Sequence, residues 1–163
     1  MGACGRRRER VSPATRLRTQ SVAKAAEILG IVEGQCDGNT IADCTISGNE
    51  SYGVYLYAYL GQCSGNTIRE NTVSRNTYTG VYLQAVTRNR IEDNNVWFTQ
   101  GQGGVDGVGI RTASTTGNFI LKNTSLGNVP NYDLDSDDTA GPIVSASGFL
   151  SGTDPWANFS RQP

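Results

Sequence analysis

Short runs of alternating apolar and polar residues recur along this chain, and glycine and asparagine separate them. The clearest copies begin at Gly38, Gly65, Arg88 and Gly117 and read G-N-T-I-A-D-C-T-I-S-G-N, G-N-T-I-R-E-N-T-V-S-R-N, R-N-R-I-E-D-N-N-V-W-F-T and G-N-F-I-L-K-N-T-S-L-G-N. Alternation with a period of two predicts strands rather than helices. A repeat of this length predicts a solenoid, because one coil cannot bury its apolar side without a neighbour.

Each repeat has a second half, in which a glycine opens another short alternating strand. The copies are G-V-Y-L at Gly53 and at Gly80, G-V-G-I at Gly107, N-Y-D-L at Asn131 and an earlier G-I-V-E at Gly30. Three short strands per coil predict an all-β fold, a right-handed parallel β-helix of about five coils. The side chains expected to point inward in the first two full coils are Ile41, Ile46, Val54, Leu56, Ile68, Val73, Val81 and Leu83.

Asparagine recurs at the predicted corners between strands. An asparagine side chain tolerates left-handed backbone geometry and bonds to neighbouring backbone, and stacked amides can bond one another along the solenoid. The expected ladders are Asn39–Asn66–Asn89–Asn118, Asn71–Asn94–Asn123 with Cys44 in the first coil, and Asn49–Asn76–Asn128. These residues are therefore assigned to the fold rather than to a site.

Four segments follow from this pattern. Residues 1–20 are expected to be a disordered basic tail or a remnant of cloning or of a misread frame, with a basic arm for an anionic partner as the alternative. The helical composition of residues 21–29 predicts a short capping helix, with Ser21 as its N-cap. The β-helix is expected over residues 30–138. Residues 139–163 are expected to form an irregular C-terminal cap, unless the ends pair with further coils of a larger chain or with a second copy.

Charge and cysteine content exclude several classes of partner. Six arginines lie between Arg6 and Arg18, so the rest of the chain is mildly acidic, which argues against nucleic acid. No apolar run follows these arginines, so the segment is neither a signal peptide nor a membrane span. Cys36 and Cys63 occupy the same position in neighbouring repeats, which leaves open a disulfide or two stacked thiols. The chain has no histidine and no C-x-x-C, so a zinc site is not expected.

The phrases G-N-T-I-R-E-N-T-V-S-R-N and G-V-Y-L resemble the parallel β-helix repeats of the pectate-lyase-like superfamily. This group includes NosD-type repeat proteins, polysaccharide lyases, mannuronan C5-epimerases and phage tailspikes. The resemblance implies an extracellular or cell-surface setting and acidic or complex polysaccharides as ligands. The C5-epimerases and alginate lyases of this group typically rely on a histidine, which this chain lacks, so an active lyase or epimerase would have to use other residues. Arg111 and Asp106, which match no family motif, are the candidate catalytic residues by coil alignment.

The candidate binding residues lie where the repeats differ. An insertion of about four residues between Trp97 and Gly107 suggests a functional loop, since solenoids carry function on such insertions. Aromatic rings and amides suit contacts with sugars, whose apolar faces and hydroxyls they match. The expected carbohydrate contacts are Trp97, Gln100 and Gln102 in this region, and Tyr55, Tyr57, Tyr82 and Gln84 on the second-half strands. Cross-strand stabilisation is the alternative role of the tyrosines.

An acidic run near the end of the repeats is a candidate metal site. Asp133, Asp135, Asp137 and Asp138 place hard oxygens along one loop, which calcium prefers, although the run departs from the EF-hand pattern. No cofactor is expected apart from this calcium hypothesis; a solvated acidic turn is the alternative.

The sequence thus predicts a polysaccharide-recognising β-helix module, a fragment or non-catalytic relative of polysaccharide-processing enzymes. Two alternatives stay open: an active lyase or epimerase, and a purely structural solenoid of an adhesin or tailspike. The expected partner is a glycan, with no nucleic acid and no membrane span; a homo-oligomer is also left open.

Overall fold

The computed structural model describes residues 16–18, 28–32, 37–58, 63–99, 101, 107–145 and 154–161. In these ranges the chain forms three parallel sheets. Sheet A contains, in spatial order, β1 (Arg16–Arg18), β3 (Thr40–Ala42), β6 (Thr67–Arg69), β9 (Arg90–Glu92), β12 (Phe119–Leu121) and β15 (Thr139–Ala140). Sheet B contains β4 (Thr45–Ser47), β7 (Thr72–Ser74), β10 (Asn95–Trp97), β13 (Thr124–Leu126), β17 (Asn158–Arg161) and β16 (Ile143–Ser145). Sheet C contains β2 (Ile28–Val32), β5 (Val54–Ala58), β8 (Thr79–Gln84), β11 (Val108–Ala113) and β14 (Tyr132–Asp133).

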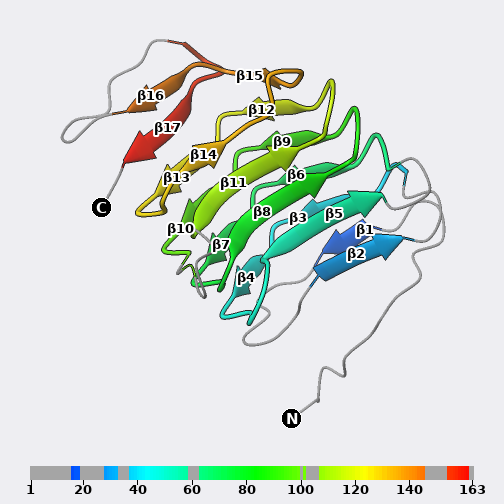
Figure 1. The fold of residues 1–163 in the computed structure, drawn as a ribbon, viewed down its shortest axis with the longest axis horizontal. Coiled ribbons are helices and arrows are strands. Elements are labelled where there is room, and N and C mark those ends of the chain that lie inside the picture. The colour runs from blue at the N-terminus through cyan, green and yellow to red at the C-terminus, as the bar shows by residue number, and fades with distance from the viewer. Residues whose placement is uncertain are drawn as a thin grey trace.

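The chain passes from sheet A to sheet B to sheet C and back, so each full coil adds one strand to each sheet. Figure 1 shows the coils stacked from the blue N-terminal strands to the red C-terminal strand. The architecture is the right-handed parallel β-helix that the repeats predict. Within the described ranges, no helix has the length and hydrophobicity that a bilayer crossing requires.

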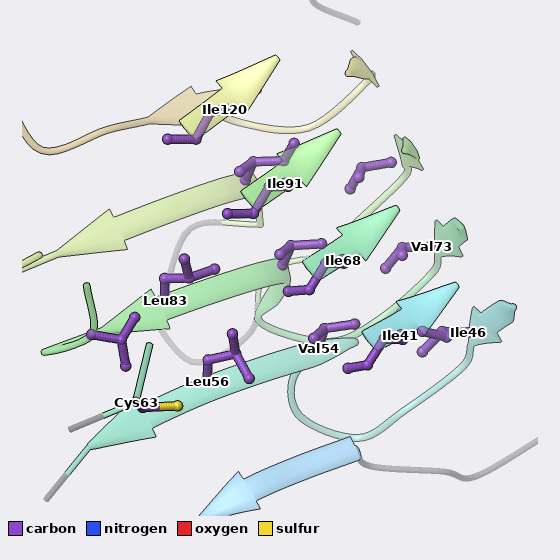
Figure 2. Packing of buried hydrophobic residues seen from close by; sticks show 14 of the residues in the cluster. Ile41, Ile46, Val54, Leu56, Cys63, Ile68, Val73, Leu83, Ile91 and Ile120 are labelled. Atoms are coloured by element: carbon purple, nitrogen blue, oxygen red, sulfur yellow. The ribbon is translucent and has the colours of Figure 1, made fainter. Parts of the chain in front are cut away.

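A column of isoleucine side chains covers the inner face of sheet A. Ile41, Ile68, Ile91 and Ile120 pair directly from coil to coil, and Figure 2 shows them in one row. All four are buried, as are the other inward side chains that the alternation predicts. Complete burial of one such side chain contributes about 1.5–3 kcal/mol, so the stacked row is a principal source of stability.

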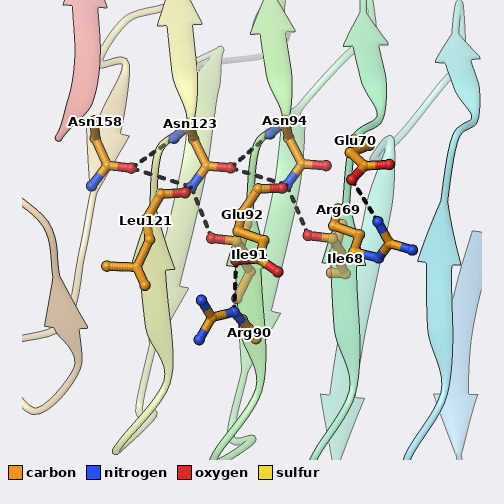
Figure 3. Close-up of polar contacts among 10 residues, drawn as sticks. All are labelled: Ile68, Arg69, Glu70, Arg90, Ile91, Glu92, Asn94, Leu121, Asn123 and Asn158. Carbon is orange, nitrogen blue, oxygen red and sulfur yellow. Dashed lines mark hydrogen bonds and ion pairs between the residues drawn. The ribbon is translucent and has the colours of Figure 1, made fainter. Parts of the chain in front are cut away.

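The corner asparagines form the predicted ladders. In the ladder of Figure 3, the Oδ1 atom of Asn123 accepts both the backbone N–H of Asn94 (3.1 Å) and its Nδ2–H (3.0 Å). Asn94 Nδ2 also donates to the carbonyl of Ile68, at 2.9 Å. Each amide therefore joins neighbouring coils through its acceptor and its donors together, and it satisfies corner backbone groups that no sheet could pair.

The left-handed geometry of the corners falls on a different residue from the one expected. The residue before each ladder position has the positive φ, as in Glu70 (56°) before Asn71 and Asp93 (53°) before Asn94. The ladder asparagines are absent from the positive-φ residues of the described chain. The turn and the amide bonds are therefore divided between two neighbouring residues, and the asparagine is needed for its side chain alone.

One ladder is interrupted. Asn49 donates to Asn76 as predicted, but Thr99 stands between Asn76 and Asn128. Thr99 keeps the backbone bond, since its N–H donates to Asn128 Oδ1 at 2.8 Å, while its buried hydroxyl has no hydrogen-bond partner. This break coincides with the inserted loop that follows β10.

The insertion is longer than the sequence suggests, because the glycine aligned with Gly80 is Gly109 rather than Gly107. Val108 pairs with Thr79, and Ile110 pairs with Val81. A Cβ at Gly109 would come 2.1 Å from Ser125 Oγ, so this crowded corner requires glycine. A two-residue slip preserves the inward and outward alternation, which is why the hydrophobic pattern did not distinguish the two registers.

The N-terminal end contains more strand than the sequence predicts. Residues 28 and 29, the last two of the predicted capping helix, begin strand β2, while residues 21–27 lie outside the described ranges. Gly30 pairs with Leu56 rather than with Gly53, a shift of three residues from the predicted alignment. Residues 16–18, assigned to the basic tail, form β1 and pair with β3.

The C-terminal segment adds strands to the sheets, where an irregular cap was expected. Strand β17 pairs with β13 on one side and with β16 on the other, so the last strand lies between two earlier ones. Asn158 extends the ladder of Figure 3, because its Oδ1 accepts from both nitrogens of Asn123. At the equivalent place in β16 the chain has Ile143, whose apolar side chain cannot bond in this way.

A single substitution tests the weight of the ladders. Asn94→Ala leaves both donors of Asn71 without their acceptor and removes three donated bonds. We expect it to lower the free energy of unfolding by roughly 2–4 kcal/mol, because each buried polar group left unpaired costs about 1–3 kcal/mol. Urea denaturation followed by circular dichroism measures this.

The neighbouring Asn95→Ala is the matched control, because Asn95 is exposed on the outer side of the same strand. It should change the free energy of unfolding by no more than about 0.5 kcal/mol. Equal effects of the two substitutions would contradict the structural role of the ladder.

Candidate functional site

The register of sheet C places four polar or aromatic side chains in one outward row. Tyr55 pairs with Tyr82, Tyr82 with Arg111, and Arg111 with Asp133. Tyr57 pairs with Gln84 in the next row, as the repeats predict. Arg111 enters the first row because of the two-residue slip at Gly109, so its place beside Tyr82 could not be predicted from the repeat phrase.

Two further tyrosines from the turns before β5 and β8 join this row. The ring centroids of Tyr52 and Tyr55 are 4.7 Å apart, and those of Tyr52 and Tyr78 are 5.8 Å apart. Tyr55 is stacked with Tyr82 at 5.1 Å and with Tyr57 at 5.6 Å. Five of the seven tyrosines of the chain thus form one cluster.

We call this surface the tyrosine face. It consists of Tyr52, Tyr55, Tyr57, Tyr78, Tyr82, Gln84, Arg111 and Asp133. Tyr82 is buried under its neighbours, whereas the other four tyrosines keep part of their rings in solvent. Tyr52 and Tyr78 were missed by sequence reasoning because they lie in turns, outside the alternating strands. The sequence gives one weak sign of their position: Tyr52 lies three residues before Tyr55, and Tyr78 lies two residues before Gly80.

Polar contacts hold the tyrosine face together. The Tyr55 hydroxyl donates to Gln84 Oε1 at 2.5 Å. The Arg111 guanidinium carbon lies 5.4 Å from the centroid of the Tyr82 ring, and Arg111 Nε is 3.1 Å from Asp133 Oδ2. The guanidinium is therefore fixed between an aromatic face and a carboxylate.

Burial affects the ionisation of the phenols. It raises the pKa of Tyr55 to about 12, and the nearby Tyr82, Tyr52 and Tyr57 add to the rise. Burial also raises the pKa of Tyr82, although the neighbouring Arg111 lowers it. Both phenols are therefore neutral hydrogen-bonding groups at physiological pH.

Trp97 lies on a different sheet from the tyrosines. It ends strand β10 of sheet B, where the Arg75 guanidinium carbon is 5.6 Å from its ring centroid and the Phe98 ring packs edge-on at 5.4 Å. Gln100 and Gln102 lie outside the described residues. The structure thus brings together Tyr55, Tyr57, Tyr82 and Gln84, and it separates them from Trp97.

The catalytic candidates do not form a described pair. Asp106 lies outside the described residues. Arg111 is held by Asp133 and by the Tyr82 ring.

The acidic run has structural partners instead of forming a calcium site. Asp138 ends the first ladder: its Oδ1 accepts both nitrogens of Asn118, and its Oδ2 accepts the Thr115 hydroxyl at 2.7 Å. Asp135 Oδ2 accepts the backbone N–H of Thr115, and Asp133 pairs with Arg111. Among the described residues no group of three or more His, Cys, Asp or Glu side chains could hold a metal ion. The calcium hypothesis is therefore not supported, and Asp138 acts as an acceptor-only cap.

The stacked coils, the corner ladders and the parallel sheets define a right-handed parallel β-helix protein. The family model described as periplasmic copper-binding protein (NosD) matches residues 18–141, and the chain belongs to this family. The resemblance to NosD-type repeats is thus confirmed. No curated protein and no solved structure matches the chain.

The family description raises the question of copper, and the described side chains do not fit it. Copper favours thiolate, thioether and imidazole ligands. The chain has no histidine, and its one methionine, Met1, lies outside the described residues. Cys44 is buried, and its thiol donates to the carbonyl of Ala42 at 3.1 Å. We therefore assign no copper ligands among these residues.

The perturbed phenol gives a pH-dependent prediction. The pKa of Tyr55 is about 12 in the folded chain, against about 10 for tyrosine in an unfolded chain. As the pH rises through this window, the Tyr55 phenol loses its proton in the unfolded chain before it does so in the folded chain. The free energy of unfolding therefore keeps its full contribution from Tyr55 below about pH 10 and loses it progressively towards pH 12. We expect Tyr55→Phe to reduce this fall, measured by urea denaturation at a series of pH values.

Absorbance titration of tyrosinate provides the direct check. The folded wild type should show one more late-titrating phenol than folded Tyr55→Phe, and both should titrate normally in urea. A Tyr55 phenol that ionises together with the exposed tyrosines would contradict the burial argument.

Proposed function

We propose that this chain is a glycan-binding β-helix module whose ligand lies on the tyrosine face. The observation that carries the proposal is the gathering of five tyrosine rings on the outer side of sheet C. The repeat itself requires none of these rings, because the fold is held by inward apolar side chains and by corner amides. Aromatic rings with neighbouring hydrogen-bonding groups are the usual composition of a site for a ligand that is apolar on one side and polar on the other. A sugar ring is such a ligand.

Binding without turnover is favoured over lyase or epimerase activity. The Arg111 guanidinium, the candidate base, is paired with Asp133 at 3.1 Å. The chain has no histidine to replace it. In agreement with the periplasmic description of the family, we place this module outside the cytoplasm.

A panel of immobilised polysaccharides tests the proposal. The panel contains cellulose, xylan, galactan, polygalacturonate and alginate, each with and without calcium. We expect retention by at least one polysaccharide, no dependence on calcium and no unsaturated product absorbing in the ultraviolet. Unsaturated product would establish a lyase, and no retention by any polysaccharide would support a purely structural solenoid.

The same panel tests the location of the site. Tyr57→Ala should weaken the affinity for the retained polysaccharide roughly three- to tenfold, since one aromatic contact contributes about 0.5–1.5 kcal/mol. Phe119→Ala is the control, because Phe119 is an exposed aromatic residue on sheet A. Equal losses in the two variants would place the glycan elsewhere or indicate a general effect on folding.

A further inference from the structure

The charges on the tyrosine face bear on the class of glycan. Among the outward side chains of β5, β8, β11 and β14 in the described chain, Arg111 and Asp133 are the charged residues. Arg111 Nε lies 3.1 Å from Asp133 Oδ2, so the cation is neutralised by a carboxylate of the same surface. The face thus offers no uncompensated positive charge to a ligand.

The charged residues within two positions of the tyrosine face along the chain are acidic. Glu50 precedes Tyr52 by two residues and is exposed. Asp135 follows Asp133 by two residues, and its carboxylate is half-buried. A polyuronate carries one carboxylate on every sugar, and like charges across an interface oppose binding and reduce the association rate. A neutral glycan meets no such repulsion.

The hydrogen-bonding groups of the face match hydroxyls. Tyr55 and Gln84 bond to one another at 2.5 Å, and both are polar without charge. The Arg111 guanidinium also has N–H donors on its two terminal nitrogens, and these can reach sugar hydroxyls while the ion pair stays intact.

From these contacts we propose that the tyrosine face selects uncharged glycans and rejects polyuronates, with the Arg111–Asp133 ion pair as the element that sets this selectivity. The proposal rests on the proposed glycan-binding function. It departs from the acidic polysaccharides that the superfamily resemblance implies.

Two pairs of oligosaccharide probes test the effect of charge, because the two members of each pair share the same sugar chain and differ in their carboxylates. One pair is hexagalacturonate and its methyl ester, and the other is soluble cellulose oligosaccharide and its C6-oxidised form. For the pair that binds, we expect the neutral member to bind up to roughly fivefold more tightly for each carboxylate that contacts the face, the upper range for exposed charge pairs. Binding of the neutral member should change little between low and high salt.

A single substitution should reverse the preference. Asp133→Asn leaves Arg111 without its counter-charge, and it disturbs little else because the Asp133 side chain is about half exposed, at 49%. We expect roughly two- to fivefold tighter binding of the acidic probe relative to the neutral one, lost at high salt. Glu70→Gln is the matched control, because Glu70 forms a similar exposed ion pair with Arg69 outside the tyrosine face.

The outcomes distinguish this inference from the function on which it rests. Equal or tighter binding of the acidic probe by the wild type would overturn the charge selectivity while leaving glycan binding in place. An Asp133→Asn variant with no gain for the acidic probe would overturn the role of the ion pair. Binding of neither member of either pair, together with no retention on the polysaccharide panel, would overturn the proposed function itself.

Discussion

The asparagine ladder is the constraint on which the rest of this structure depends. A corner between strands exposes backbone N–H and C=O groups that no sheet can pair, and these corners are buried between coils. Each ladder amide accepts two bonds from the coil before it and donates to the coils around it, as Asn94 does. The register of the coils is therefore fixed at the corners, and the side chains on the outer faces are free to vary.

The ladders also explain how the solenoid ends. The first ladder ends on a carboxylate, because Asp138 Oδ1 accepts both nitrogens of Asn118. In the second ladder Asn158 of the C-terminal segment accepts from Asn123, whereas Ile143, at the same position in β16, has no side-chain acceptor. Asp138 and Asn158 thus have the same role, since each provides the terminal acceptor of a ladder.

The sequence alone predicted the β-helix, the inward apolar columns, most ladder members and the pairing of Tyr55 with Tyr82. The sequence did not predict features for which two registers have the same hydrophobic pattern, or features that depend on contacts between distant parts of the chain. A two-residue slip at Gly109 leaves the alternation unchanged, so crowding against Ser125 decided the register and brought Arg111 to the tyrosine face. Asn158 lies outside the repeat and joins it only in three dimensions. Tyr52 and Tyr78 are turn residues, whose contacts depend on how two coils stack.

Fold and proposed function therefore lie on different surfaces: corners and interior hold the coils, and the outer side of sheet C is the proposed glycan site. Chemical-shift mapping by NMR tests this most directly, with the tightest-binding neutral oligosaccharide titrated into isotope-labelled protein. The account predicts shifts concentrated in β5, β8 and β11 and in the side chains of the tyrosine face. Shifts concentrated in sheet A or around Trp97 on sheet B would contradict it.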